Sequence, residues 1–281
     1  MIFAKLYSIL SFFVMFKTMM RMISGAGEAT LLRKTALVSP AEDRLPVYTL
    51  TFANPPGMNS LGVRMDYGDV VKVVVPGYKP KSYSMSDERP GEFDITFKVY
   101  PNGRASGFLD RIPIGGGVEV FRKGSNERVP GKYIGILAFG VGITEALPLA
   151  EAELGKPDAQ RVNLIWQARN KADTFWADRI AALKSRYPDK FEITYVFSQE
   201  VVEGSLHGRV NGSVFQSLTT TRWQEKDSDA FAASEVRFVT VGTKEMMYQA
   251  DEMITKIGYP MPQHALFQKG GGGGGRRGRE L

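Results

Sequence analysis

The chain of 281 residues is long enough for two modest domains, and its hydrophobic (43%) and charged (23%) fractions are those of globular proteins. It has no cysteine and only two histidines, so disulfides, thiolate metal sites and a cysteine nucleophile are excluded, and no metal site is expected. The net charge of +6 gathers at the two ends of the chain, which leaves a nearly neutral body and gives no sign of a groove for nucleic acid.

Residues 1–27 are apolar and basic, with Lys5, Lys17 and Arg21 and no acid. The run between the two lysines is too short to span a bilayer comfortably. It suits a signal peptide, an organellar presequence or a membrane-surface anchor, and a buried first helix is the simpler alternative. We expect a targeting or membrane-contact segment. Its destination stays open between the mitochondrion and the secretory pathway or endoplasmic reticulum, and either setting is favoured over the free cytoplasm.

Residues 28–128 contain short β-rich runs broken by turns, with one short helical stretch, SGFLDRI. Runs of this length and spacing predict a small antiparallel barrel. The expected strands are ATLLRKTALV, VYTLTF, VVKVVV, KSYSMS, FDITFKVY and GVEVF.

Strands alternate with helices in residues 129–269, which begin with a VPGK linker. This order predicts a doubly wound parallel sheet that binds ligands at the carboxyl ends of its strands. The glycine-rich residues 270–281 are expected to be disordered. The expected elements are the strands YIGILAF, RVNLIWQA, FEITYVFS and EVRFVTVG, and the helices TEALPLAEAEL, ADTFWADRIAALKSRY and KEMMYQADEMITKIG.

A glycine-rich turn follows the first strand of this second domain. Gly140 and Gly142 let the backbone turn sharply and approach a phosphate, and the next helix presents its free N–H groups. The third glycine of the usual dinucleotide fingerprint is missing, so a turn without a ligand explains these residues equally well.

Charged residues follow the second strand of this domain, where a nucleotide ribose would bind. An acid such as Asp173 would bind the 2′-hydroxyl, and cations such as Arg169 and Lys171 would accept a 2′-phosphate. A solvated helix start, with the acid near its N-terminus, is the alternative.

The barrel carries two polar motifs, KSYSMS and then FKVYPNGRASGFLD. Gly103 allows close approach of a ligand, and Ser106 falls where a short helix is expected to begin. The serine hydroxyl and the helix start could hold a phosphate, and helix capping alone would also explain the serine.

Together these motifs resemble the ferredoxin–NADP reductase superfamily, and within it the branch of cytochrome b5 reductase and the reductase part of flavohaemoglobin. The resemblance covers roughly residues 28–267. Members typically show Arg-x-Tyr-Ser/Thr, Gly-x-x-Ser, Gly-x-Gly-Ile-Thr-Pro and Cys-Gly-x-x-x-Met, in that order. The corresponding residues here are Lys81-Ser-Tyr83-Ser84, Gly103-Arg104-Ala105-Ser106, Gly140-Val141-Gly142-Ile143-Thr144-Glu145 and Val241-Gly242-Thr-Lys-Glu-Met246.

The resemblance implies an FAD site in the barrel. Tyr83 would lie against the flavin ring, and Ser84 would place its hydroxyl near the flavin N5. Lys81 would neutralise the FAD pyrophosphate, assisted by backbone N–H groups of residues 103–106. Residues implied to line the cofactor from the neighbouring strand are Lys98, Val99 and Tyr100.

The resemblance implies a nicotinamide-nucleotide site in the second domain. Thr144 and the turn of residues 140–142 would hold the nucleotide, and Gly242 to Met246 would close over it. Tyr83, Ser84 and Thr144 are therefore the expected catalytic residues, and FAD with NADH or NADPH the expected cofactors. Asp173 favours NADH, while Arg169 and Lys171 favour NADPH.

The sequence departs from the family pattern at several positions. Lys81 replaces an arginine and keeps the charge without the bidentate fork. Glu145 replaces the proline at the helix start, and Val241 replaces a cysteine. The Gly-Pro-x-Gly that usually follows the barrel is also missing. These departures bear more on the nicotinamide step than on FAD binding.

The expected function is therefore an FAD-dependent NAD(P)H oxidoreductase. It would pass a hydride from nicotinamide to flavin and then single electrons to a separate acceptor, such as a cytochrome b5-like haem protein. Its partners would be the nucleotide donor, this acceptor and a membrane contacted through residues 1–27, without nucleic acid. The alternative is a degenerate relative that binds flavin, or nothing, and serves in interaction or assembly.

Overall fold

The computed structural model describes residues 27–55, 70–124, 130–229, 231–261 and 263–268. The chain forms two compact units. The first comprises residues up to 35 together with 48–125, and the second comprises residues 36–47 together with those from 126 onward. Residues 1–26 of the expected segment 1–27, and the glycine-rich tail, lie outside the described residues.

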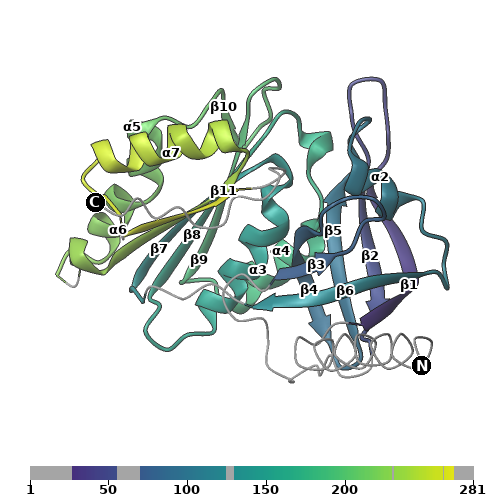
Figure 1. Cartoon of the computed structure of the whole chain (residues 1–281). Helices are drawn as coiled ribbons and strands as arrows, with labels where there is room; N and C mark the ends of the chain where they lie inside the picture. Colours follow the sequence, from purple (N-terminus) through teal and green to yellow (C-terminus); the bar gives the residue numbers. More distant parts are fainter. Residues whose placement is uncertain (1–26, 56–69, 125–129, 230, 262, 269–281) are drawn as a thin grey trace, which may run out of the picture. The chain divides into compact units, whose positions relative to one another are not determined.

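The first unit is a closed six-stranded barrel, as the sequence predicts (Figure 1). Leu50, Phe52 and Phe93 are fully buried within it, and the two phenylalanine rings stack with centroids 5.4 Å apart. Burial of such apolar side chains is the main stabilising contribution to a small barrel. The strands, in barrel order, are β1 (Gly27–Val38), β2 (Val47–Ala53), β5 (Glu92–Lys98), β4 (Lys81–Arg89), β3 (Val70–Val73) and β6 (Gly117–Gly124).

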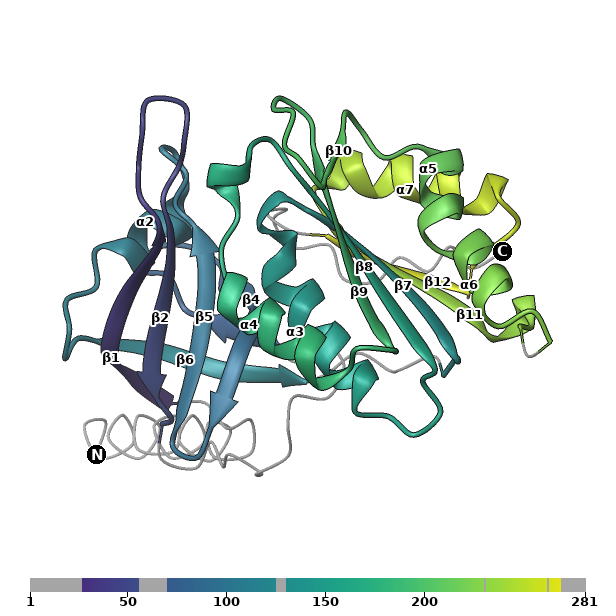
Figure 2. The same cartoon turned by 180° about the vertical axis from the view of Figure 1, so that it is seen from behind.

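The second unit is a parallel sheet with helices on both faces, as Figures 1 and 2 show. Helices α3 (Ile143–Leu154) and α4 (Ala177–Arg186) cover one face of the sheet. Helices α5 (Gly212–Leu218), α6 (Thr220–Lys226) and α7 (Lys244–Lys256) cover the other. The strand order is β10 (Leu206–His207), β9 (Phe191–Phe197), β8 (Arg161–Ala168), β7 (Tyr133–Phe139), β11 (Val236–Gly242) and β12 (His264–Gln268).

Strand β7 is buried along nearly its whole length, as expected for a central strand covered on both faces. The strands that follow it along the chain, β8 to β10, lie on one side of β7, and β11 and β12 lie on the other. The order of strands therefore reverses at β7. In open α/β sheets, ligands bind beyond the carboxyl ends of the strands at such a reversal.

Among the described residues, the sequence analysis missed the strands β10 and β12 and the α-helices α5 (Gly212–Leu218) and α6 (Thr220–Lys226). The two helices are too short for a clear helical period, and their burial rests on a few aromatic side chains. Trp223 is fully buried and donates to Asn163 Oδ1 at 2.9 Å, while Asn163 donates to the Leu218 carbonyl at 2.8 Å. A mid-strand asparagine of β8 thus anchors both helices.

The helix expected over residues 172–187 begins later than predicted. Residues 171–173 form a 3₁₀ turn, and α4 starts only at Ala177. Trp176, immediately before it, has a φ of 62°, a left-handed conformation that no α-helix contains. No helix in the described part of the chain is both long enough and apolar enough to cross a membrane.

Candidate functional site

The barrel places the three residues of its first motif on β4. Lys81, Tyr83 and Ser84 pair with Val73, Val71 and Val70 of β3, respectively. Tyr83 is half-buried, and its ring meets Phe97 edge-on with centroids 6.0 Å apart. Burial, together with the neighbouring Tyr100, raises the pKa of Tyr83 well above its usual value. Its hydroxyl therefore stays protonated at neutral pH and can donate a hydrogen bond.

Ser84 is buried in the barrel wall, with 7% of its surface exposed. Lys98 is the last residue of β5, and Val99, which follows it, is partly buried against the barrel core. Lys98 and Val99 are therefore carried by the strand next to β4 in the barrel order.

The second barrel motif forms a closed turn that leads into helix α2 (Arg104–Asp110). The Ser106 hydroxyl accepts from the Tyr100 N–H at 3.2 Å and donates to the Gly103 carbonyl at 3.3 Å. A side chain at Gly103 would place its Cβ only 2.1 Å from the serine oxygen, so only glycine fits there. Gly103, Arg104, Ala105 and Ser106 therefore form one compact unit with the end of β5.

The structure corrects one detail of this motif. Gly103 occupies the N-cap of α2, and Ser106 is the third residue of the helix rather than its cap. Its hydroxyl reaches back to the loop, where it satisfies the Tyr100 N–H and adds a second hydrogen bond to the Gly103 carbonyl, which also accepts from the Gly107 N–H.

In the second unit, the turn after β7 is a short 3₁₀ helix, Gly140–Gly142. Gly140 has a φ of 54°, which favours glycine, and its carbonyl accepts from the Trp166 indole N–H at 2.9 Å. A Cβ at Gly142 would lie 2.5 Å from the carbonyl oxygen of Val241. The two glycines thus serve different purposes: one allows the turn and the other allows β11 to pass close by.

Helix α3 starts directly after this turn. Ile143 is fully buried, and Thr144 is 3% exposed and donates its hydroxyl to the Val141 carbonyl at 2.9 Å. Glu145 is also buried, with 6% exposed. The first turn of α3 therefore contains a fixed hydroxyl and a buried carboxyl group.

The end of β11 lies beside the same turn. A Cβ at Gly242 would approach the Phe139 ring to 2.9 Å, so the backbone is closely packed there. Met246 is half-exposed, whereas its neighbour Met247 is buried and its sulfur lies 3.7 Å from the Thr240 hydroxyl. The sequence motif singled out the accessible methionine and missed the packing role of the next one.

A second polar cluster follows β8 at the same edge of the sheet. Arg169 is exposed, and its guanidinium donates to Asp173 Oδ2 at 3.2 Å and to the Asp43 carbonyl at 2.7 Å. Lys171 is exposed, and its backbone N–H donates to Glu200 Oε2 at 2.6 Å. Glu200 was missed, although its place just after β9, at the carboxyl edge of the next strand, was a usable signal.

The structure therefore brings the expected residues together in two groups, each within its own unit. In the barrel, β4, the end of β5 and the start of α2 carry the flavin motif residues. In the sheet, the turns after β7 and β8 and the end of β11 carry the nucleotide motif residues. Among the described residues, no three histidine or acidic side chains gather as a metal ion would need.

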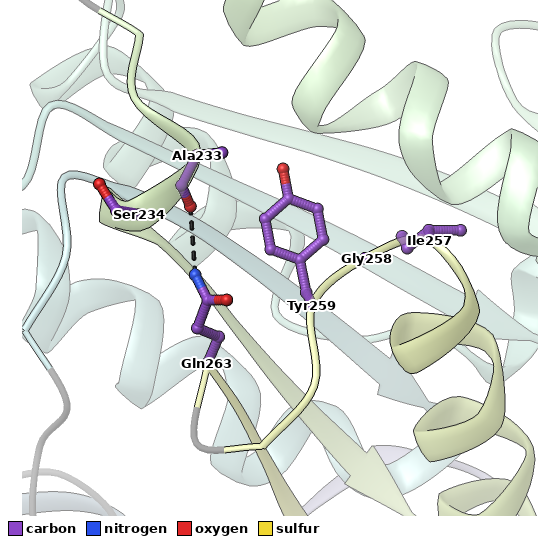
Figure 3. A pocket seen from close by; sticks show the side chains of 6 residues that line it. All are labelled: Ala233, Ser234, Ile257, Gly258, Tyr259 and Gln263. Atoms are coloured by element: carbon purple, nitrogen blue, oxygen red, sulfur yellow. Dashed lines mark hydrogen bonds between the residues drawn. The ribbon is translucent and has the colours of Figure 1, made fainter.

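A pocket of about 430 Å³ lies elsewhere in the second unit, as Figure 3 shows. Its lining comes from the segment before β11 and from the end of α7 (Lys244–Lys256) onward, where Gln263 donates to the Ala233 carbonyl at 3.1 Å. This is the amino-terminal side of β11, opposite the edge that carries the glycine-rich turn. The pocket is therefore not the expected nucleotide site. Its lining residues are Ala233, Ser234, Ile257, Gly258, Tyr259 and Gln263.

Comparison with known proteins agrees with this arrangement. Residues 136–252 match the family described as "Oxidoreductase NAD-binding domain". Over 154 residues the chain is 33% identical to NADH-cytochrome b5 reductase 1 of Dictyostelium discoideum, covering 52% of this chain and 54% of that protein. A ferredoxin NADP⁺ reductase from Neisseria gonorrhoeae, solved with bound FAD and NADP, shares the fold with a TM-score of 0.67. It is 17% identical and covers 87% of this chain and 98% of its own.

The chain is therefore similar in sequence to NADH-cytochrome b5 reductases and similar in fold to ferredoxin–NADP reductases. This confirms the resemblance drawn from the motifs, including its cytochrome b5 reductase branch. The cytochrome b5 reductase domain of Ulva prolifera nitrate reductase has the same fold, with a TM-score of 0.66 and 19% identity over 86% of this chain and 97% of that one. The chain spans only about half the length of the first curated relatives that it matches.

Proposed function

We propose that the protein is an FAD-dependent NAD(P)H reductase that passes electrons to a separate acceptor. The observation that carries the proposal is the combination, in one chain, of two sites. One is a barrel with an aromatic and hydroxyl-bearing strand beside a glycine-led helix start. The other is a parallel sheet with a glycine turn at its reversal point.

The residues of the barrel fit FAD. Gly103 packs directly against the Ser106 hydroxyl and so holds the backbone at the start of α2 in a fixed position, where it could bind a phosphate. Lys81 would neutralise the diphosphate, and the half-buried ring of Tyr83 would lie against the flavin. Bound FAD would supply the hydride-accepting and electron-transferring chemistry of the enzyme.

The roles of the barrel side chains follow from their chemistry. The hydroxyl of Tyr83, protonated at neutral pH, would donate a hydrogen bond to the ring system. Ser84, buried in the wall, would hold its hydroxyl near the reacting nitrogen. Burial of both groups would exclude water from the reacting face.

The sheet would bind the nicotinamide nucleotide. The close packing of Gly142 against Val241 would fix the turn beside the end of β11, where its backbone could bind the diphosphate, and Gly242 with Met246 would close over the nucleotide. Thr144 gives its proton to Val141, so its oxygen keeps lone pairs that can accept a hydrogen bond from the carboxamide.

The donor preferred by the enzyme would be NADH. The guanidinium of Arg169 is already engaged by a carboxylate and a carbonyl, so a 2′-phosphate would have to displace those contacts. Lys171 is the cation that could still attract NADPH. Steady-state kinetics with both donors test this choice. A higher kcat/KM for NADPH would show that the cations dominate.

The decisive experiment is spectroscopic. The purified protein should be yellow, with FAD released on denaturation, and anaerobic NADH should bleach the flavin absorbance within seconds. Absence of bound FAD, or of any uptake from added FAD, would contradict the proposed function.

A second function is favoured by one observation: the buried carboxyl group of Glu145 lies in the first turn of α3, where the nucleotide diphosphate is expected. A negative charge there would repel the diphosphate, and the protein would then be a flavin-binding partner in assembly rather than an enzyme. A yellow protein that no nicotinamide nucleotide reduces would favour this alternative.

The acceptor and the cellular setting extend the same proposal. Because relatives of the chain are NADH-cytochrome b5 reductases, a cytochrome b5-like haem protein is the proposed acceptor. The basic, apolar residues 1–27 support an organellar or membrane-associated setting.

A further inference from the structure

Two cations of the barrel lie over the same aromatic ring. Lys81 Nζ is 5.0 Å from the centroid of the Tyr78 ring, and the guanidinium carbon of Arg104 is also 5.0 Å from it. The three residues come from different elements: the turn after β3, the first residue of β4 and the first residue of α2. Tyr78 therefore links the two barrel motifs that the sequence placed far apart.

The turn that carries Tyr78 is fixed by the backbone. The Tyr78 N–H donates to the Val75 carbonyl at 3.0 Å, and Gly77 has a φ of 67°, which glycine adopts without strain. Tyr78 is 37% exposed, Arg104 is exposed and Lys81 is half-buried, so solvent or a ligand can reach the cations. Within the described part of the chain, the contact with Tyr78 is the charged-group contact observed for each of the two cations, and neither forms an ion pair with an acid.

Two like charges that share a ring repel each other, and the negative face of the ring offsets part of that repulsion. A bound dianion would offset the rest, because one oxyanion group could face each cation. The arrangement is thus suited to a diphosphate, which carries its charge over two neighbouring phosphoryl groups.

We propose that Tyr78 is a positioning residue that holds Lys81 and Arg104 for the diphosphate of FAD, and so selects a dinucleotide flavin over FMN. This inference rests on the proposed function. The inference adds to the proposed function a residue, Tyr78, that touches the two cations rather than the flavin ring. It also gives a reason why the protein would bind FAD rather than FMN.

The test compares the affinities of the apoprotein for FAD and FMN in three variants. Tyr78→Leu removes the ring, Tyr78→Phe keeps it, and Tyr48→Leu is a matched control in the same barrel, since Lys34 lies 4.4 Å from the Tyr48 ring. Tyr78→Leu should raise the FAD dissociation constant by about fivefold to tenfold, with a smaller change for FMN. Tyr78→Phe should restore FAD binding to within about twofold, and Tyr48→Leu should leave the ratio of FAD to FMN affinity unchanged.

A double-mutant cycle shows whether Tyr78 acts through the cations. In an Arg104→Gln background, Tyr78→Leu should cause a clearly smaller loss of FAD affinity than in the wild type. Additive losses, or equal losses for FAD and FMN, would overturn the proposal. Wild-type protein that binds no FAD would contradict the proposed function itself. Normal FAD binding by Tyr78→Leu would contradict only the role of Tyr78.

Discussion

Single hydroxyl groups hold the candidate sites in shape. Ser106 bridges the N–H of Tyr100 and the carbonyl of Gly103, and Thr144 does a similar task for Val141 in the sheet. Side-chain bonds to loop backbone of this kind are ordinary structural devices. They leave each oxygen with remaining lone pairs and a fixed position, which is what a ligand-binding hydroxyl requires.

Removing the Tyr83 ring and the Ser106 hydroxyl together should prevent the barrel from retaining FAD. In the variant Tyr83→Ala/Ser106→Ala, the flavin loses its apolar face and the loop loses its anchor to Tyr100. We expect most of the bound FAD to be lost, as measured by the ratio of flavin to protein absorbance after purification. Ser82→Ala, an exposed change on the same strand, is the control and should keep its flavin. Full retention of FAD in the double variant would place the flavin elsewhere.

The close approach of β11 to the turn of residues 140–142 leads to a second prediction, for a substitution at Gly142. Gly142→Ala would bring a Cβ to 2.5 Å from the Val241 carbonyl, so the turn must move, at a cost of roughly 1–3 kcal/mol. We expect KM for NADH to rise about tenfold or more while FAD content is unchanged. The measurement is steady-state kinetics with ferricyanide.

Gly155→Ala is the matched control for that substitution. It lies at the other end of α3, where the nearest atom would be 3.5 Å from the added Cβ, an ordinary contact. An unchanged KM in Gly142→Ala would show that the turn does not approach the nucleotide.

At the scale of elements, a few polar pairs secure the helices that the sequence did not predict. Arg161 at the start of β8 makes two hydrogen bonds to Asp227, the residue that follows α6, at 2.5 and 2.7 Å. These bonds lower the pKa of Asp227 below its usual value. The pair fixes α6 against the amino-terminal end of β8, because a helix of seven residues is too short to carry a long apolar stripe.

This pair gives a pH-dependent prediction. Because the carboxyl pKa is lower in the folded protein than in the unfolded chain, its stabilising contribution is present above the unfolded pKa and is lost as pH falls through the folded one. Asp227→Asn should lower the free energy of unfolding by about 1 kcal/mol at pH 7, since both side chains are partly exposed. The difference from wild type should shrink as the pH falls below the usual aspartate range.

Urea unfolding at pH 7 and at pH 3 measures that difference. Asp229→Asn is the control, an exposed acid two residues further along the chain, and should be neutral at both pH values. An equal loss for Asp227→Asn at both pH values would show that shape, rather than charge, holds the pair.

At the scale of the whole molecule, the boundary of the fold at its amino-terminal end can be tested. Strand β1 begins at Gly27 and pairs with β6 from its first residue, so the barrel already has its six strands without residues 1–26. Protein beginning at Gly27 should fold, bind FAD and reduce ferricyanide at a rate within about twofold of the full chain. Circular dichroism and the flavin spectrum monitor its folding.

The removed segment has a prediction of its own. Fused to a fluorescent protein, residues 1–26 should move the fusion out of the diffuse cytosolic pool, as expected for a basic and apolar segment. The fusion with Lys5, Lys17 and Arg21 changed to Gln is the control. A shortened protein that precipitates without flavin, together with a cytosolic fusion, would identify the segment as part of the core.

The sequence by itself determined the two-part architecture. Strand periodicity, the β-rich runs before Val129 and the alternating strands and helices after it are local properties, and local properties can be seen without the fold. The turns at Gly103 and Gly140 were equally visible, since glycine marks places where a side chain cannot be tolerated. The fold class was confirmed because these signals are independent and agree.

Only the tertiary structure decided how the side chains are used. No spacing in the sequence shows that Glu200 holds the loop of Lys171, that Met247 rather than Met246 is buried, or that one tyrosine ring receives two cations. The short α5 and α6 were missed for the same reason: their stability comes from Trp223 meeting Asn163 across the sheet, a contact between residues 60 positions apart. Contacts between residues far apart in the sequence leave no pattern in the sequence near either residue, so they become visible only in the folded structure.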